Sequence, residues 1–291
     1  MQLKRKFDAE EFAILAEMEP PKGVDVSAMV MNAKRVKGEV DAFVVPEMSN
    51  AVMRMSSLGG AMILQAKGME TVMQVNCRDR NRIALQADLL AAYGCGITNV
   101  MAVTGEDLSF GDHFQARSVY DIDLLELLRT IGCLEKGKDM AGIELSGSPE
   151  FVLGSTVNAG AKGKSTELEI EEMNKKMEAG AQFFISPPLF DLSAIQPFIK
   201  RVEQKKIKII PTVLLLKSLG MARYIMRNVD NVYIPDSLID RIRKSSDKVR
   251  ECILIASEMV TSLKTEGFSG VNIATIGWEH KLPEIIDNVH P

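Results

Sequence analysis

Residues 71–104 read TVMQVNCRDRNRIALQADLLAAYGCGITNVMAVT. Two mainly apolar runs, 71–77 and 99–104, flank a segment, 81–93, whose apolar residues recur at three- and four-residue spacing. An asparagine opens this segment and a glycine follows it, as is typical of the two ends of a helix. Apolar runs without polar alternation are typical of strands covered on both faces. The stretch therefore predicts a strand–helix–strand unit of a parallel sheet.

The same alternation extends along the whole chain. A helix is predicted at 166–179, where Glu167 and Glu169 suit the positive end of the helix dipole and a glycine follows the last turn. The longest helical segment is 236–263, with an expected break near 245–246. The predicted strands are 12–18, 41–45, 71–77, 99–104, 141–145, 182–186, 208–214 and 271–276.

Eight strand–helix units without a linker favour a single (β/α)8 TIM barrel, an α/β fold, formed by residues 1–291 as one catalytic domain. The chain of 291 residues has the usual length of such a barrel. A doubly wound open sheet is the alternative, because periodicity does not reveal closure.

Composition excludes several classes of protein. The net charge of −4 argues against a nucleic-acid partner, and no apolar run approaches the roughly 20 residues of a membrane span. The first residues lack the apolar core of a signal peptide, and the four cysteines form no CxxC pair, so we expect a cytoplasmic protein. The three histidines are far apart in sequence, so no metal site is expected.

Residues 16–23, AEMEPPKG, end the first predicted strand with two carboxylates. Glu17 and Glu19 alternate along it, so both side chains face the same side, taken as the barrel interior. Pro20 and Pro21 then direct the chain out of the sheet. A carboxylate at the mouth of an apolar barrel loses solvation, which raises its pKa and suits a general acid. The alternative is a strand-end acid paired with a Lys or Arg.

Two connections are expected on the catalytic face of the barrel: 104–119, and the glycine-rich stretch 147–165, whose backbone N–H groups are suited to a phosphate. The alternative is that both are flexible loops. Glu106 and Asp107 follow the fourth predicted strand and Glu144 lies within the fifth. Each carboxylate is either an acceptor for the N–H donors of a heterocycle or a member of a salt bridge.

Tyr120 and Trp278 are candidates for stacking on a flat cofactor, with a packing role as the alternative. The charged run 78–82, RDRNR, is interpreted as an ion-paired helix start, with contact to a phosphate or to the anionic tail of a ligand as the alternative. The sequence contains no GxSxG elbow, no Walker loop and no GxGxxG after the first strand.

Taken together, these segments resemble the methylenetetrahydrofolate reductase family, particularly the form found in anaerobic microbes with one-carbon metabolism, along nearly the whole chain. The segments that carry the resemblance are AEMEPPKG at 16–23, VNCRDRNRIALQADLLAAYGCGITNVMAVTGED at 75–107, GDHFQARSVYDID at 111–123, KKMEAGAQFFISPPLFD at 175–191 and NIATIGWEHKLPEI at 272–285.

The resemblance implies a (β/α)8 barrel that binds FAD, with FMN as the alternative, and reduces 5,10-methylenetetrahydrofolate to 5-methyltetrahydrofolate by hydride transfer, as in methionine biosynthesis or the acetyl-CoA pathway. Glu17 matches the family's catalytic acid, which opens the methylene bridge, and Glu106 is implied to be a second catalytic residue, beside the flavin and pterin rings. The residues implied to bind the cofactor are Gln74, Asn76, Thr104, Gly105, Tyr120, Glu169, Glu172, Lys175 and Lys176.

Three positions depart from the family pattern. Glu106 replaces an Asp, Pro187 stands where many members have a folate-binding Gln, and Glu172 replaces a neutral amide near the flavin phosphate. These departures put individual contacts and the choice of FAD over FMN in doubt.

The implied electron donor is NADH or a partner electron-transfer subunit, and a homo-oligomer or hetero-complex is expected. Two other functions stay open: a pterin-binding methyltransferase barrel, which needs no flavin, and a non-catalytic flavin- or folate-binding subunit of a larger redox complex.

Overall fold

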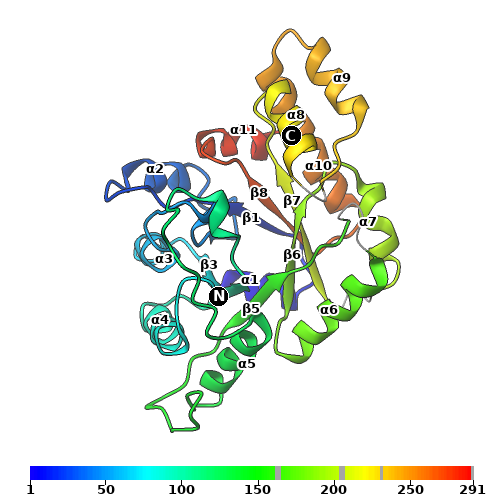
Figure 1. Cartoon of the computed structure of the whole chain (residues 1–291). Coiled ribbons are helices and arrows are strands. Elements are labelled where there is room, and N and C mark those ends of the chain that lie inside the picture. Colours follow the sequence, from blue (N-terminus) through cyan, green and yellow to red (C-terminus); the bar gives the residue numbers. More distant parts are fainter. Residues whose placement is uncertain (161–164, 203–206, 230–231, 290–291) are drawn as a thin grey trace.

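A computed structural model describes residues 1–160, 165–202, 207–229 and 232–289, in which parallel strands close into one barrel (Figure 1). Each strand pairs with the next along the chain, and the last pairs with the first, which confirms the (β/α)8 barrel and excludes an open sheet. The strands are β1 (Ala13–Glu17), β2 (Ala42–Val45), β3 (Thr71–Asn76), β4 (Asn99–Val103), β5 (Val152–Thr156), β6 (Phe183–Pro188), β7 (Lys208–Leu214) and β8 (Gly270–Ala274).

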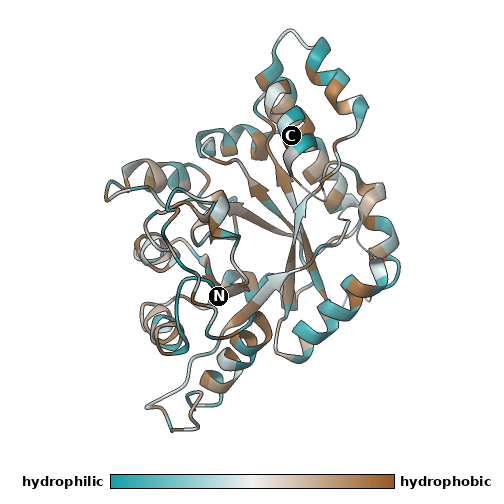
Figure 2. Ribbon diagram, in the orientation of Figure 1, coloured by the Kyte–Doolittle hydropathy of each residue, from teal (hydrophilic) through white to brown (hydrophobic). Residues whose placement is uncertain are grey.

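Helices surround the barrel, and Figure 2 shows apolar strands at its centre with polar residues on the outer faces of the helices. Among the described residues, no helix is long and apolar enough to cross a membrane. The helices are α1 (Gln2–Asp8), α2 (Ser27–Arg35), η1 (Ser49–Ala51), α3 (Ser57–Gln65), α4 (Arg82–Gly94), η2 (Leu108–Phe110), α5 (Leu124–Glu135), α6 (Thr166–Glu178), α7 (Leu192–Ile199), α8 (Leu219–Asn228), α9 (Asp236–Lys244), α10 (Lys248–Thr265), η3 (Glu279–Lys281) and α11 (Leu282–Asp287).

Local sequence signals set several helix ends. The Asn81 side chain accepts a hydrogen bond from the Ala84 backbone N–H at 3.0 Å, which caps α4 as predicted. The segment 236–263 is broken as expected, because Ser245 has an extended backbone and Asp247 begins a new helix by capping the Arg250 N–H.

The fifth predicted strand is wrong. Residues 141–145 form an exposed connection, and the strand at this place in the barrel is β5, inside the stretch predicted to be a glycine-rich loop. Residues 161–164 of that stretch lie outside the described residues. The central glycine of β5, Gly154, is the reason that the strand was not recognised, because glycine disfavours an isolated strand.

Gly154 is required by the packing of the barrel interior. A Cβ atom at this position would lie 2.2 Å from Cζ of Phe183, a fully buried ring on the neighbouring strand β6. The Phe183 ring packs against Phe7 of α1, with 5.7 Å between ring centroids. Helix α1 therefore closes the amino-terminal end of the barrel through Leu3 and Phe7, and the carboxyl-terminal end is left for a site.

Candidate active site

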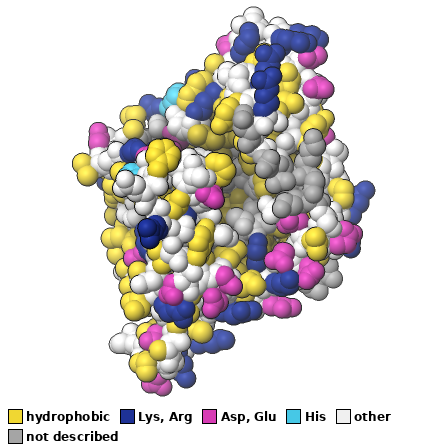
Figure 3. Space-filling view, in the orientation of Figure 1, with side chains coloured by type: hydrophobic (Ala, Val, Ile, Leu, Met, Phe, Trp, Pro, Cys, Tyr) yellow, Lys and Arg dark blue, Asp and Glu magenta, His cyan; other side chains and the backbone are white. Residues whose placement is uncertain are grey.

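A cavity of about 560 Å³ lies at the carboxyl-terminal end of the barrel, on the face shown hollowed in Figure 3. Its walls combine apolar side chains with several polar groups, which is the usual character of a small-molecule site. The lining residues are Glu17, Glu19, Pro46, Glu47, Met48, Ser49, Asn50, Gln74, Met101, Val103, Thr104, Gly105, Glu106, Thr156, Asn158, Ile185, Ser186, Pro187, Pro188, Thr212, Leu214, Asn272, Ala274 and Ile276.

Glu17 is the last residue of β1 and lies in the wall of this cavity. Burial among apolar strands raises the pKa of its carboxyl to about 7, and the negative charges of Glu19, Glu279 and Glu106 add to the shift. None of the ion pairs found among the described residues involves Glu17. The carboxyl therefore keeps a proton over much of the range in which other glutamates have lost theirs.

Glu19 lies beyond the end of β1 and lines the same cavity, as its spacing from Glu17 predicted. Its Oε1 lies 2.9 Å from Nε of Arg54. Burial raises the pKa of the Glu19 carboxyl, and the positive charge of Arg54 opposes that rise. Two glutamates of one motif thus have different environments, since only the outer one has a cation beside it.

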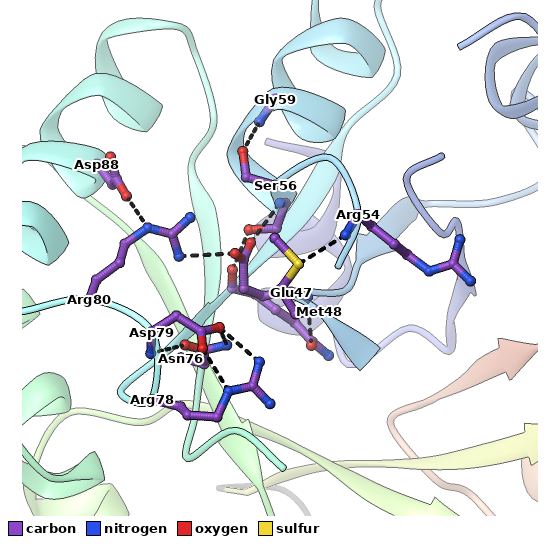
Figure 4. A network of polar contacts seen from close by, with 12 residues as sticks. Glu47, Met48, Arg54, Ser56, Gly59, Asn76, Arg78, Asp79, Arg80 and Asp88 are labelled. Atoms are coloured by element: carbon purple, nitrogen blue, oxygen red, sulfur yellow. Dashed lines mark hydrogen bonds and ion pairs between the residues drawn. The ribbon is translucent and has the colours of Figure 1, made fainter. Parts of the chain in front are cut away.

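A third carboxylate, Glu47, lines the cavity from the connection after β2 and is almost fully buried (Figure 4). Its Oε1 accepts a hydrogen bond from Arg80 at 2.9 Å, and its Oε2 accepts the Ser57 backbone N–H at 2.6 Å. Arg80 also pairs with Asp88 on α4. This network joins the β2 connection to the start of α3 and to α4.

The connection that Glu47 holds has a backbone rarely adopted by side-chain-bearing residues. Met48, Asn50 and Ala51 have φ angles of 49°, 54° and 54°. Such strain persists only where surrounding contacts hold it, and it is common at functional sites. The connection faces Glu106. Burial raises the pKa of the Glu106 carboxyl, and the backbone of Asn50 and the positive charge of Arg78 oppose that rise in part.

Glu106 stands at the rim of the cavity, and as a whole residue it is exposed. Gly105 precedes it with φ 92°, and a Cβ there would lie 2.8 Å from Cβ of Arg78. Arg78 is 2% exposed and donates to the Glu106 carbonyl oxygen at 2.8 Å. The turn is therefore built against a buried arginine and presents the Glu106 side chain to the cavity.

The turn after β8 forms another wall. Ile276 has φ 46°, which is an outlier for a β-branched residue, and its side chain lines the cavity. The Lys217 ammonium donates to the Ile276 carbonyl oxygen, and Glu279 accepts the Gly277 N–H at 2.7 Å. Lys217 also lies 5.5 Å from the ring centroid of Trp278, so this tryptophan packs within the turn.

A second cavity of about 490 Å³ shares Thr104 with the first. Tyr120, Glu172 and Lys176, three of the residues that the resemblance implies to bind the cofactor, line it together. The Lys176 Nζ donates to the Thr156 carbonyl oxygen at 2.7 Å, and burial lowers its pKa. Tyr120 has φ 39° and is 45% exposed, and its hydroxyl donates to the Gly105 carbonyl oxygen at 3.5 Å.

Three predicted cofactor residues line neither cavity. Asn76 is buried and exchanges hydrogen bonds with Asp79. Glu169 accepts from the backbone N–H of Asn158, a cavity residue, at 3.2 Å. Lys175 forms exposed ion pairs with glutamates of its own helix. All three side chains therefore contact neighbouring residues and do not line either cavity.

Two other candidate carboxylates, Glu144 and Asp107, line neither cavity. Glu144 is exposed in a connection and not within a strand, and Asp107 caps η2 by accepting the Ser109 N–H. The charged run is ion-paired as interpreted: Arg78 pairs with Asp79, Arg80 with Glu47 and Asp88, and Arg82 with Asp121.

Sequence reasoning missed Glu47, Asn272 and Thr212 as cavity residues. A signal was present, because each is a polar residue inside an apolar strand or within two residues of its end, where an inward side chain needs a partner. In the part of the chain that the structure describes, no group of three or more His, Cys, Asp or Glu side chains is arranged to hold a metal ion.

The described residues fit a flat ring better than a diphosphate. The main cavity has apolar walls at Met101, Val103 and Leu214 beside polar groups at its rim. The second cavity has one cation, Lys176, against the two carboxylates of Asp123 and Glu172. A phosphate there would meet more negative than positive charge.

The chain and its fold are similar to those of several known proteins. Over 187 residues the chain is 25% identical to methylenetetrahydrofolate reductase 2 of Schizosaccharomyces pombe, a match of 62% of this chain to 28% of that longer protein. A solved structure of an uncharacterized protein from Clostridium thermocellum, which binds two copies of 5-methyl-5,6,7,8-tetrahydrofolic acid, has a TM-score of 0.63 at 13% identity and covers 99% of this chain and 97% of that one.

The EDTA monooxygenase EmoA of Chelativorans sp. BNC1 has the same fold at a TM-score of 0.55 and 11% identity, covering 96% of this chain and 93% of that one. At such identities the structural likenesses establish the fold alone. The family model for methylenetetrahydrofolate reductase, in contrast, matches residues 2–290. Because that match covers the barrel and every segment that lines its cavity, the chain belongs to the methylenetetrahydrofolate reductase family.

Proposed function

We propose that this protein reduces 5,10-methylenetetrahydrofolate to 5-methyltetrahydrofolate with a bound flavin. The observation that carries the proposal is Glu17, a carboxyl with a pKa of about 7 in the wall of a cavity of about 560 Å³. A general acid works best when its pKa lies near the working pH. Family membership supports the substrate class.

Glu17 delivers its proton to a folate nitrogen as the bond from that nitrogen to the methylene carbon breaks. The methylene carbon is left as an iminium ion on the other nitrogen, and it accepts the hydride. A reduced flavin supplies that hydride when it is bound. Glu17 then recovers its proton from solvent, which reaches the cavity through its open mouth.

The cavity residues have binding roles in this proposal. Gln74, Thr104 and Gly105 hold the edge of the flavin ring, and Glu106 accepts hydrogen bonds from ring N–H groups. We propose that the cofactor is FAD, with FMN as the alternative. Tyr120, Glu172 and Lys176 border the part of it nearest the ring, because a phosphate in the second cavity would meet more negative than positive charge. Asn76, Glu169 and Lys175 act by supporting these residues.

The electron donor is either NADH or a partner electron-transfer subunit. The solved protein that binds 5-methyl-5,6,7,8-tetrahydrofolic acid in the same fold supports a reduced folate as the substrate. We propose a cytoplasmic enzyme that works as a homo-oligomer or in a hetero-complex.

The test is spectroscopic. The protein is purified without denaturation, its visible spectrum is recorded, and 5-methyltetrahydrofolate is added without oxygen. We expect flavin bands that bleach, because the reverse reaction returns a hydride to the cofactor. A colourless protein that takes up neither FAD nor FMN would contradict the proposal and favour a flavin-free reductase or a pterin methyltransferase.

Glu17→Gln separates an enzyme from a binding subunit. The variant keeps the size of the side chain and removes the proton donor. We expect a yellow protein that still accepts electrons from dithionite but is not bleached by 5-methyltetrahydrofolate. Exposed Glu10→Gln, on the other end of the barrel, is the matched control and should bleach at the rate of the unmodified protein.

A further inference from the structure

Asn272 is a buried polar residue in the middle of β8 whose side-chain oxygen has no partner. It is 3% exposed and lines the main cavity. Among the described residues, no donor reaches its Oδ1 atom. A buried amide oxygen that has lost its hydrogen bonds to water and accepts none from the protein destabilises the fold. Such an atom therefore requires an explanation.

The orientation of the Asn272 amide follows from its neighbours. The Thr212 hydroxyl donates its single proton to the Ser186 carbonyl oxygen at 2.7 Å, so Thr212 Oγ1 can act toward Asn272 only as an acceptor. The Asn272 Nδ2 donates to it at 3.3 Å. This chain of hydrogen bonds holds the nitrogen toward β7 and leaves the oxygen as the free acceptor.

Strand register places Asn272 deep in the cavity. It pairs with Leu15 on β1 and with Thr212 on β7, whereas Glu17 stands two residues further toward the mouth. Another polar residue of the cavity, Gln74, already uses its Oε1 to accept the Glu47 N–H at 3.3 Å. Pro187, which also lines the cavity, has no side-chain hydrogen-bonding group.

We propose that Asn272 is a specificity-determining residue whose Oδ1 accepts a hydrogen bond from the 2-amino group of the substrate's aminopyrimidinone ring. The inference rests on the proposed function, since it takes the substrate to be a reduced pterin. A pterin carrying a charged glutamate tail leaves that tail in solvent, so the opposite edge of the ring, which bears the 2-amino group, enters deepest. A neutral amide oxygen suits this uncharged N–H donor.

The test compares two ligands on two proteins. Affinities are measured by calorimetry for 5-methyltetrahydrofolate and for an analogue in which a methyl group replaces the 2-amino group. We expect the unmodified protein to prefer the amino compound by about tenfold or more, because the methyl group leaves Oδ1 unpaired. In Asn272→Leu this preference should vanish, while thermal stability stays equal or rises because an unpaired buried acceptor is removed.

Asn99→Leu is the matched control. Asn99 is also fully buried with an Oδ1 that lacks a partner among the described residues, but it lies at the start of β4 and not in the cavity. Its substitution should leave the ligand preference unchanged. Should Asn272→Leu fail to fold, Asn272→Ala and the preference of the unmodified protein still test the inference.

Equal affinity of the unmodified protein for the two ligands would overturn the role of Asn272, and so would a preference that survives in Asn272→Leu. A protein that binds neither ligand would instead contradict the proposed function. The two failures are therefore distinguishable.

Discussion

Arg54 places its Nε 2.9 Å from Oε1 of Glu19, and so gives a counter-ion to the outer of two glutamates that line one cavity. The inner one, Glu17, has none among the described residues, and its pKa rises to about 7. A pair of carboxylates with separated proton affinities is a common feature of sites that perform acid–base chemistry. The division of roles in this motif follows from which carboxylate the arginine reaches.

The pH dependence of folate reduction should report Glu17. An acid is active while protonated, and the raised pKa keeps Glu17 protonated up to about pH 7. We therefore expect kcat/KM to be level below that pH and to fall about tenfold per unit above it. In Glu17→Gln the residual kcat/KM should not show this fall, which is the descending limb of the pH profile. A limb that persists in the variant would assign the proton to another group.

Glu19→Gln should move the same limb to lower pH. The charge of Glu19 is the largest electrostatic contribution that raises the Glu17 pKa, after burial. Removing this charge makes ionisation of Glu17 easier, so its pKa falls and activity is lost at a lower pH. The measurement is the pH profile of kcat/KM for the variant beside that of the unmodified protein. An unchanged midpoint would show that the charge of Glu19 does not contribute to the Glu17 pKa.

Gly154→Ala should destabilise the barrel by roughly 3 kcal/mol, the upper range for overpacked cores. The added Cβ would lie 2.2 Å from the Phe183 ring. Denaturant unfolding measures the loss, and Phe183→Leu should cost less in the Gly154→Ala protein than alone, because the two sites are coupled. Gly132→Ala on α5, where a Cβ meets nothing within 4 Å, is the control and should be neutral or stabilising.

Ile276→Gly should stabilise the protein and weaken ligand binding. The residue has φ 46°, and relief of that strain is offset in part by the greater freedom of glycine in the unfolded chain, for a net gain of about 1 kcal/mol. The apolar wall that Ile276 contributes to the cavity is lost. Thermal unfolding and folate affinity are measured together. Ile276→Val, which keeps the branched side chain, should show neither change.

Glu47→Gln should loosen the connection after β2. The amide keeps the shape of the side chain but loses the charge that binds Arg80 and the Ser57 N–H. We expect a loss of about 2 kcal/mol and faster proteolytic cleavage within residues 46–56. Asp88→Asn, on the outer side of the same network, leaves the Glu47 pair intact and should cost less than 1 kcal/mol, as is roughly usual for partly exposed pairs. Equal effects of the two substitutions would contradict this division.

Much of the barrel follows from local sequence. Continuous apolar runs alternate with helices whose starts are marked by residues such as Asn81 and Asp247, so seven of the eight strands can be predicted without a structure. Glu17 was also within reach, because a carboxylate at the end of an apolar strand, followed by two prolines, faces the mouth of a barrel.

The strand β5 could not be predicted from the sequence. Gly154 is required by the Phe183 ring on another strand, and glycine has no local preference for a sheet. The same holds for the free oxygen of Asn272, whose orientation depends on hydrogen bonds that run through Thr212 to Ser186. It holds for Glu19, whose cation comes from Arg54, 35 positions further along the chain.

The sequence by itself therefore determined the alternation of strands and helices, apart from the position of β5, and placed a carboxylate at the end of the first strand, because periodicity and chain direction act over neighbouring residues. Tertiary structure decided that the sheet closes, which glycine faces which ring, and which carboxylate keeps its proton. Those outcomes depend on burial and on charges brought close by folding, and the free energy of a proton or a packed ring is set by all the atoms around it.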